Sequence, residues 1–182
     1  MYLIYKSLFY KITAVMRFLL LKIWYFRRLS VAELSMIGRK CGIYIQGKGR
    51  IQCQGRIILN DHVMLQSKGL LEIGGHFGIN SYSRIIAHEH IQIGHHVTIG
   101  QMVSILDHDH DFSIQEGNLV LDGYQTAPIH IGNHVWIGDK VTVLKGVSIG
   151  NNVVVGAHTL VNKDVPDNCI IGGVPFKILK RL

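Results

Sequence analysis

The sequence predicts an all-β fold, a left-handed parallel β-helix, and the main observation behind this prediction is a repeat of six residues. From Ile131 to Val161 an aliphatic residue recurs at every sixth position, and glycine follows most of these residues. Apolar residues recur every three or four positions in an α-helix and every two in a half-buried strand. A six-residue period instead indicates short strands and turns wound around a three-sided prism, with about 18 residues per coil.

The same period is present upstream, in three runs that differ in register. The runs are Ile51, Ile57 and Val63, then Ile73, Ile79, Ile85 and Ile91, and finally Ile93, Ile99 and Ile105. Each change of register indicates a corner with additional residues. Glycine after a ladder residue is expected where a turn needs a positive φ or where two backbones approach closely. Polar residues are expected at the corners.

The ladder stops between Ile105 and Ile129, in a segment that holds five of the twelve acidic residues of the chain. In a regular repeat fold, a long insertion is typical of a functional loop. We therefore expect a β-helix over residues 33–165 with an excursion loop at 106–128. A short C-terminal tail over residues 166–182 follows it.

The composition is that of a folded chain, because 48% of its 182 residues are hydrophobic and only 17% are charged. The three cysteines, Cys41, Cys53 and Cys169, are odd in number and too scattered for a disulfide framework or a zinc site. They favour a reducing, cytoplasmic compartment.

The net charge of +7 is concentrated near the N-terminus. Residues 1–50 hold ten Lys or Arg and one acid, a net of +9, whereas residues 51–182 hold nine basic and eleven acidic residues, a net of −2. The body of the protein therefore lacks the positive charge that is typical of nucleic-acid binding.

Residues 1–32 are expected to form an amphipathic, basic N-terminal helix. Cations interrupt the apolar sequence too often for a transmembrane helix, which needs about 20 mostly apolar residues. A signal peptide is not indicated, because no small-residue cleavage site follows. The cations are Lys6, Lys11, Arg17, Lys22, Arg27 and Arg28.

One face of this helix collects an apolar stripe. The stripe consists of Leu8, Ile12, Val15, Leu19, Ile23 and Phe26. An apolar stripe with a basic rim and aromatic residues near one end is typical of a helix lying on an anionic membrane surface, here through residues 1–29. The alternative is that the stripe packs on the body or on another subunit.

The segment from Pro128 to Lys180 resembles the closing part of hexapeptide-repeat sugar O-acetyltransferases. That family includes galactoside and maltose acetyltransferases and the O-acetyltransferases of bacterial surface-polysaccharide clusters. The resemblance is carried by the VWIG corner at 135–138, the VPDN turn at 165–168 and the GVPFKILK ending at 173–180, and it extends back to about Ile37. It implies a homotrimer with acyl-CoA sites in clefts between subunits. It also implies a loop histidine that deprotonates an acceptor hydroxyl as its oxygen attacks acetyl-CoA, with no metal required.

Two of the eleven histidines lie in the loop, in the run from Asp107 to Asp111. An O-acyl transfer needs a base with a pKa near neutral within hydrogen-bond reach of the hydroxyl. The resemblance aligns best with His110 as this base, and His108 is the alternative. In an extended strand the three aspartates would face one way and both histidines the other. Asp107 or Asp109 could orient the ring.

The other histidines are weaker candidates for a catalytic role. His88 and His90 flank Glu89 and remain open for a site role. Six others lie at or beside corners of the ladder, where a solvated side chain is expected, and they are His62, His76, His95, His96, His134 and His158.

The resemblance also assigns residues to the acceptor and to the cofactor. Asn80 matches a family asparagine that reaches the acceptor from the coil below. The cofactor positions are Trp136, Gly138, Gly156, Ala157, Lys163, Lys177 and Lys180. Backbone amides beside glycine and lysine ammonium groups suit the pantetheine arm and the phosphates. The sequence departs from the family at His158 and Thr159, where a small residue and serine are usual, and at Phe176, where alanine is usual.

Two other functions remain open. A γ-type carbonic anhydrase holds zinc with three histidines, but beside His90 and His95 the chain offers only Gln54 at the third position. A catalytically inactive scaffold or glycan-binding module is the second alternative. The helix favours an acceptor that is a polysaccharide or lipid-linked glycan precursor at the inner face of the membrane. Neither the hydroxyl, nor O- against N-acetylation, nor the length of the acyl chain and its carrier follows from the sequence.

Overall fold

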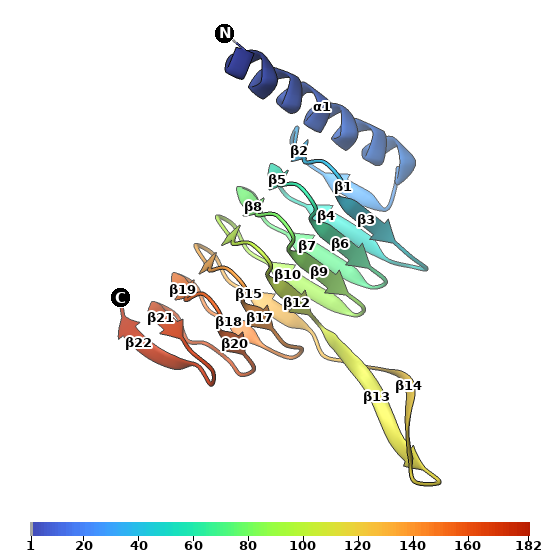
Figure 1. Cartoon of the computed structure of the whole chain (residues 1–182), viewed down its shortest axis with the longest axis vertical. Helices are drawn as coiled ribbons and strands as arrows, with labels where there is room; N and C mark the ends of the chain where they lie inside the picture. The colour runs from blue at the N-terminus through green and yellow to red at the C-terminus, as the bar shows by residue number, and fades with distance from the viewer. Residues whose placement is uncertain (1) are drawn as a thin grey trace.

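The computed structural model describes residues 2–182, with side chains from residue 8 onward. Lys6 of the predicted cationic set lies outside the described side chains. Three parallel β-sheets form the faces of a prism, one α-helix lies across the N-terminal end, and a long β-hairpin projects from one edge (Figure 1). The predicted left-handed parallel β-helix is confirmed.

The three sheets, named faces A, B and C, receive one strand each in turn as the chain winds. Face A contains β1 (Leu29–Val31), β4 (Arg50–Cys53), β7 (Leu70–Ile73), β10 (His90–Ile93), β15 (Ile129–Ile131) and β18 (Ser148–Ile149). Face B contains β2 (Met36–Ile37), β5 (Ile57–Leu59), β8 (Phe77–Ile79), β11 (Thr98–Ile99), β16 (Trp136–Ile137), β19 (Val153–Val155), β21 (Cys169–Gly172) and β22 (Lys177–Arg181). Face C contains β3 (Gly42–Ile45), β6 (Met64–Ser67), β9 (Arg84–Ala87), β12 (Ser104–Leu106), β17 (Thr142–Val143) and β20 (Leu160–Val161).

The ladder residues point into the prism and form one continuous core. Every ladder position named from the sequence is buried, from Ile51 to Val161. Neighbouring coils stack these side chains in register, for example Ile99 on Ile137. Since each coil contacts only its neighbours, the six-residue pattern alone is enough to specify the stack.

The length of a coil differs between the two halves of the prism. Ile51 pairs with Leu71 and Leu71 with Ile91, so these two upstream coils have 20 residues, whereas the first coil has 22 because Leu29 pairs with Ile51. Ile131 pairs with Ile149, so the downstream coil has 18. The expected length therefore holds only downstream. The two additional residues lie at the corner between faces C and A, which is also where the hairpin is inserted.

The corners use left-handed backbone at residues other than glycine. His76, His96 and His134 occupy successive corners between faces A and B with φ of 58°, 57° and 56°. Their rings stack at centroid distances of 4.6 and 4.8 Å. The glycine after the ladder residue serves close packing instead, because a Cβ on Gly94 would lie 2.7 Å from the Gly132 oxygen. Of the two reasons expected for these glycines, close backbone approach is correct and a positive φ is wrong.

Helix α1 (Tyr2–Trp24) covers the N-terminal end of the prism. Ala14 and Phe18 are buried, and Phe18 belongs to the main core. Arg17 Nε donates a hydrogen bond of 3.1 Å to the Ile37 oxygen, and the Tyr25 hydroxyl, just beyond the helix, donates one of 2.9 Å to the Ile43 oxygen. These contacts satisfy carbonyl groups of the first coil.

The predicted apolar stripe of α1 is not the face that packs on the prism. Its residues are exposed, with Leu8 at 53% and Ile23 at 75%, and only Val15 is half-buried. The packing face consists of other residues, because the small Ala14 lets the helix approach and Phe18 fills the open end of the core. No helix in the described part of the chain is long and apolar enough to cross a membrane.

Candidate active site

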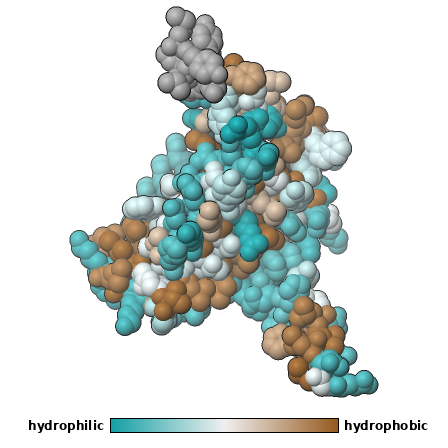
Figure 2. All heavy atoms as spheres, in the orientation of Figure 1, coloured by the Kyte–Doolittle hydropathy of each residue, from teal (hydrophilic) through white to brown (hydrophobic). Residues whose placement is uncertain are grey.

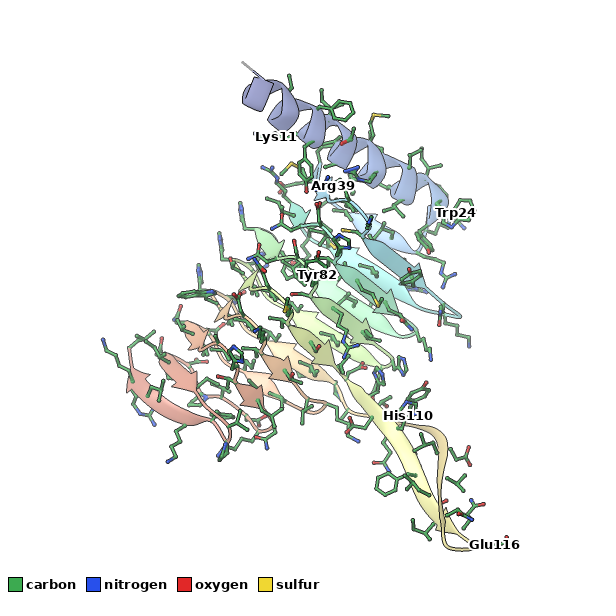
Figure 3. The ribbon with its side chains drawn as sticks, in the orientation of Figure 1. Lys11, Trp24, Arg39, Tyr82, His110 and Glu116 are labelled. Atoms are coloured by element: carbon green, nitrogen blue, oxygen red, sulfur yellow. The ribbon has the colours of Figure 1, made fainter. Side chains whose placement is uncertain are left out.

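The excursion loop is a β-hairpin of β13 (His108–Gln115) and β14 (Asn118–Thr126). Glu116 and Gly117 join the strands with φ of 50° and 79°, which is the conformation of a tight hairpin turn. The Ala127 amide donates a hydrogen bond of 2.9 Å to the Asp107 oxygen and closes the base of the hairpin. Figure 3 shows His110 near this base and Glu116 at the tip.

Asp107 is the buried anchor of the hairpin. It has no exposed surface, and its carboxylate accepts hydrogen bonds of 2.7 and 2.8 Å from the amides of His88 and Glu89 in the preceding coil. Its Oδ1 also lies 3.3 Å from Nδ1 of His108. The expectation that all three aspartates face away from the histidines is therefore wrong for Asp107, because this residue precedes the extended strand.

His108 is held on two sides. Its ring stacks on the ring of His88 at 3.5 Å and 9°, and its side chain is only 13% exposed. A hydrogen bond from Nδ1 to Asp107 leaves the lone pair on Nε2, and such a carboxylate–imidazole pair is the usual arrangement of an oriented general base. Burial, followed by the charges of His108 and Lys68, lowers the pKa of His88 to about 4, so His88 is neutral near pH 7.

His110 has a more open position on the same side of β13. It pairs in register with Tyr124, and the two rings lie 4.7 Å apart with a tilt of 35°. Asp109 is 3.5 Å from the Lys145 ammonium, and Asp111 accepts a hydrogen bond of 2.8 Å from Gln125. Within the described residues, no carboxylate forms a hydrogen bond with the His110 ring.

Tyr124 and Lys68 complete this cluster, and neither was identified from the sequence. Tyr124 contacts His88 and His108 through ring edges at 4.6 and 5.4 Å. The Lys68 ammonium lies 4.8 Å from the centre of the Tyr124 ring. Tyr124 could have been found by folding the loop as a hairpin about Gly117, whereas Lys68 belongs to another coil and has no local signal.

Asn80 is not brought to the histidines within one chain. It follows β8 at the corner between faces B and C, and its side-chain oxygen accepts a hydrogen bond of 2.6 Å from Asn60. The hairpin leaves from the opposite edge of face C. The acceptor role of Asn80 therefore remains a prediction.

Four of the seven predicted cofactor residues line one cleft on face B. The cleft has a volume of about 280 Å³, and these four residues are Trp136, Gly138, Gly156 and Ala157. Trp136 is 58% exposed and also borders a neighbouring cleft of about 480 Å³. A Cβ on Gly138 would lie 2.8 Å from the Ala157 amide, so glycine keeps the coils in contact and the cleft open.

The three predicted lysines lie near the C-terminal end of the prism, two on face B and Lys163 just after β20 of face C. Lys177 and Lys180 are on the exposed strand β22, which pairs antiparallel with β21. The Lys163 ammonium lies 5.0 Å from the centre of the Phe176 ring. The unusual Phe176 is buried, and the unusual Thr159 accepts a hydrogen bond of 3.3 Å from the Gly173 amide. Both departures from the family pattern thus stabilise the C-terminal turn.

The histidine cluster and the face-B cleft lie on different sides of one chain. The hairpin projects from the edge between faces C and A, and Trp136 begins a strand of face B. A single copy therefore carries both halves of the predicted site without joining them.

The histidines that the zinc site would need form contacts with other residues. His90 Nε2 lies 2.7 Å from the Glu72 carboxylate, and His95 Nδ1 accepts a hydrogen bond of 2.9 Å from the Gly75 amide. Across the residues that the structure describes, no three His, Cys, Asp or Glu side chains converge as a metal site. The arrangement therefore gives no support to a γ-type carbonic anhydrase.

Comparison with known proteins shows which families this chain resembles. Residues 128–163 match the family described as bacterial transferase hexapeptide (six repeats). This match confirms the resemblance to hexapeptide-repeat acetyltransferases that the VWIG corner and the ladder indicate.

Two curated relatives from Escherichia coli (strain K12) are similar to this chain over a short segment each. The putative lipopolysaccharide biosynthesis O-acetyl transferase WbbJ is 49% identical over 57 residues, which cover 31% of this chain and 29% of the relative. The galactoside O-acetyltransferase is 47% identical over 55 residues, 30% of this chain and 27% of the relative. The chain thus spans less than a third of the length of these relatives.

Among solved structures, the chain is similar to AntD, an N-acyltransferase from Bacillus cereus in complex with dTDP and 3-hydroxybutyryl-CoA. The TM-score is 0.68 at 23% identity, over 84% of this chain and 82% of AntD. This similarity shows a shared fold along most of the β-helix.

Proposed function

We propose that this protein is an acetyltransferase that moves an acetyl group from acetyl-CoA to a hydroxyl of a sugar, with a histidine at the base of the hairpin as general base. The observation that carries the proposal is the ring of His108, held between the buried Asp107 carboxylate and the neutral His88 ring. The geometry favours His108 over His110, which the sequence ranks first, because only the former has an orienting carboxylate.

In the proposed reaction, Nε2 of His108 accepts the proton of the acceptor hydroxyl while the hydroxyl oxygen attacks the thioester carbonyl. The carbon–sulfur bond then breaks, and the imidazolium returns the proton to the CoA sulfur. Asp107 stabilises the imidazolium during these steps. A positioned base of this kind contributes about 10²–10⁴-fold to the rate.

A homotrimer would join the two halves of the site, with the hairpin of one copy against the face-B cleft of the next. The hairpin supports this arrangement, because one of its faces is apolar and uncovered. Phe112 pairs with Leu121 and Ile114 with Leu119, and all four side chains are more than half exposed (Figure 2). A two-stranded hairpin is marginally stable by itself, so a neighbouring copy is the expected cover.

The cleft of Trp136, Gly138, Gly156 and Ala157 is the proposed site of the pantetheine arm, and Lys163, Lys177 and Lys180 are the proposed phosphate contacts. Exposed lysines suit an anionic nucleotide, and AntD is a related fold with an acyl-CoA bound. The named activities of the two curated relatives favour a hydroxyl acceptor. We propose a polysaccharide or lipid-linked glycan precursor on the cytoplasmic side of a membrane as this acceptor.

The test is acceptor-dependent release of CoA from acetyl-CoA by the purified protein, measured over a panel of sugars and lipid-linked glycans. His108→Ala is expected to lower kcat by about 10²–10⁴-fold. The matched control, His110→Ala, stands two residues away on the same strand and is expected to change kcat by less than about tenfold.

Each other result has a defined meaning. A loss confined to His110→Ala would move the base to His110. If no acceptor releases CoA and calorimetry detects no CoA binding, the acetyltransferase is overturned and the scaffold or glycan-binding module takes its place.

A further inference from the structure

Helix α1 has two opposite faces, and only one of them is used by the described chain. The inner face packs on the prism through Ala14 and Phe18. The outer face is apolar and open along its whole described length. Its exposed large hydrophobic residues are Leu8, Phe9, Ile12, Met16, Leu19, Leu20, Ile23 and Trp24. A patch of this size on one helix is far more than scattered surface residues explain, and it marks a binding surface.

From this geometry we infer that the outer face of α1 docks the protein on an anionic membrane surface, with the helix lying in the plane of the interface. The charge around the helix supports this partner. Residues 1–32 contain no acid, and Glu33 is the only one among the first 50 residues. Lys11 and Lys22 are exposed on the flank between the inner and outer faces, and Arg27, which follows the helix, is also exposed. Basic side chains beside an apolar face match anionic headgroups.

The anchoring of α1 also fits a docking surface rather than a mobile tail. Its inner face is fixed by the Arg17 and Tyr25 hydrogen bonds and by Tyr10, whose hydroxyl donates a hydrogen bond of 2.8 Å to Asp61. Figure 3 shows Lys11 and Trp24 on a helix that lies across the end of the prism. The protein therefore presents a preformed, flat apolar face, and the bilayer need not fold it.

The inference rests on the proposed function where it concerns the trimer and the substrate. Around a threefold axis parallel to the prisms, the three α1 helices lie at the same end. Three weak contacts on one surface raise the overall affinity strongly. The same end then faces the membrane in every copy, and the hairpins stand farther along the axis.

This geometry sets the height of the histidine cluster above the surface. Face C places β3, β6, β9 and β12 between α1 and the hairpin, at about 4.8 Å per strand. Three such spacings separate β3 from β12, and adding a helix diameter of about 10 Å places His108 roughly 25 Å from the docked surface. A sugar directly on a carrier lipid lies below this height, so the geometry favours a longer lipid-linked oligosaccharide as the acceptor.

The first test uses the full chain with vesicles of phosphatidylcholine, with and without phosphatidylglycerol, in co-sedimentation. Binding is expected only to the anionic vesicles and is expected to weaken with salt. The variant Phe9→Ser/Leu20→Ser/Ile23→Ser is expected to weaken binding by at least about tenfold. The matched control Met64→Ser/Met102→Ser changes exposed residues remote from α1 and is expected to bind as the parent does.

A second variant tests the same surface without changing its apolar side chains, so that the result does not depend on correct folding of the first variant. Lys11→Glu/Arg27→Glu leaves every apolar side chain in place and is expected to weaken binding to anionic vesicles by a similar factor. Both variants are expected to retain CoA release with a soluble acceptor. If the parent does not bind anionic vesicles, or if both variants bind as the parent does, membrane docking is overturned. If the serine variant instead halves the particle mass in solution, a second copy covers the face, and docking is also overturned.

The substrate is tested separately in vesicles that carry lipid-linked acceptors of different lengths. A rate that rises from the monosaccharide to the oligosaccharide is expected, and equal rates overturn the height argument. Vesicle binding without any CoA release would overturn the acetyltransferase and leave the docking surface standing, so the two failures are distinguishable.

Discussion

The two appendages of the β-helix, helix α1 and the β13–β14 hairpin, differ in how much of each is stabilised by the chain itself. Helix α1 buries one face against the end of the core and is fixed by hydrogen bonds to the first coil. Among the described residues, the hairpin is held near its base, through Asp107, the Ala127 amide, the stacking of His108 on His88 and the contact of Asp109 with Lys145. Helix α1 completes the monomer, and in the proposed trimer the hairpin would be covered by a neighbouring copy.

This comparison is tested most strongly by removing one aromatic side chain from each appendage. Phe18→Ala is expected to lower the free energy of unfolding by about 3–5 kcal/mol, because a fully buried ring leaves a cavity at the end of the core. Phe112→Ala removes a ring that is 65% exposed in the monomer, so its effect is expected to come from assembly into the proposed trimer.

Equilibrium denaturation at two protein concentrations separates the two cases. The loss in Phe18→Ala is expected to be the same at both concentrations. The loss of unfolding free energy in Phe112→Ala is expected to grow with protein concentration, because assembly stabilises the parent by mass action and the variant assembles less. A loss of equal size at both concentrations for Phe112→Ala would contradict the interface role of the hairpin.

A charge on the apolar face of the hairpin also tests whether a neighbouring copy covers that face. Leu121→Asp places a carboxylate opposite Phe112, and burying it in an interface without a partner is costly. We expect the proposed trimer to dissociate at concentrations about tenfold or more above those at which the parent dissociates, as measured by sedimentation. Asp122→Asn, on the neighbouring exposed position, serves as the control and is expected to leave the assembly intact.

The residues of the core can be predicted from local sequence, whereas the number of residues in each coil cannot. Ile131 to Val161 show the period because each coil repeats the same three strands. The 20-residue coils upstream depend on corners between faces C and A, where additional residues change the register without changing the core pattern. For the same reason, the sequence shows that the ladder is interrupted but does not show that the insertion pairs as a hairpin.

The face used by α1 and the better-oriented histidine could not be predicted for a shared reason, since both depend on distant backbone. The apolar stripe identifies the more hydrophobic side of α1, but the open end of the core selects Ala14 and Phe18. Asp107 orients His108 because the amides of the preceding coil hold its carboxylate. The spacing of residues along the chain predicts neither the packing of α1 on the core nor the contact of Asp107 with the preceding coil.

The smallest effect is expected at the contact that joins α1 to the second coil, the Asp61 carboxylate. Partial burial raises the pKa of Asp61, but hydrogen bonds from the Arg39 amide and guanidinium and from the Tyr10 hydroxyl outweigh it and lower the pKa to about 2, from 3.8. Since the folded pKa is depressed, this stabilisation is fully present above pH 3.8 and is lost as the pH falls toward 2. Arg39 is 69% exposed and screened by solvent, so the contribution is expected to be below about 1 kcal/mol. The unfolding temperature of Asp61→Asn is expected to lie below that of the parent at pH 5 and to converge with it near pH 2. If the difference in unfolding temperature between the two proteins stays the same across this pH range, the charge of Asp61 does not hold α1 in place.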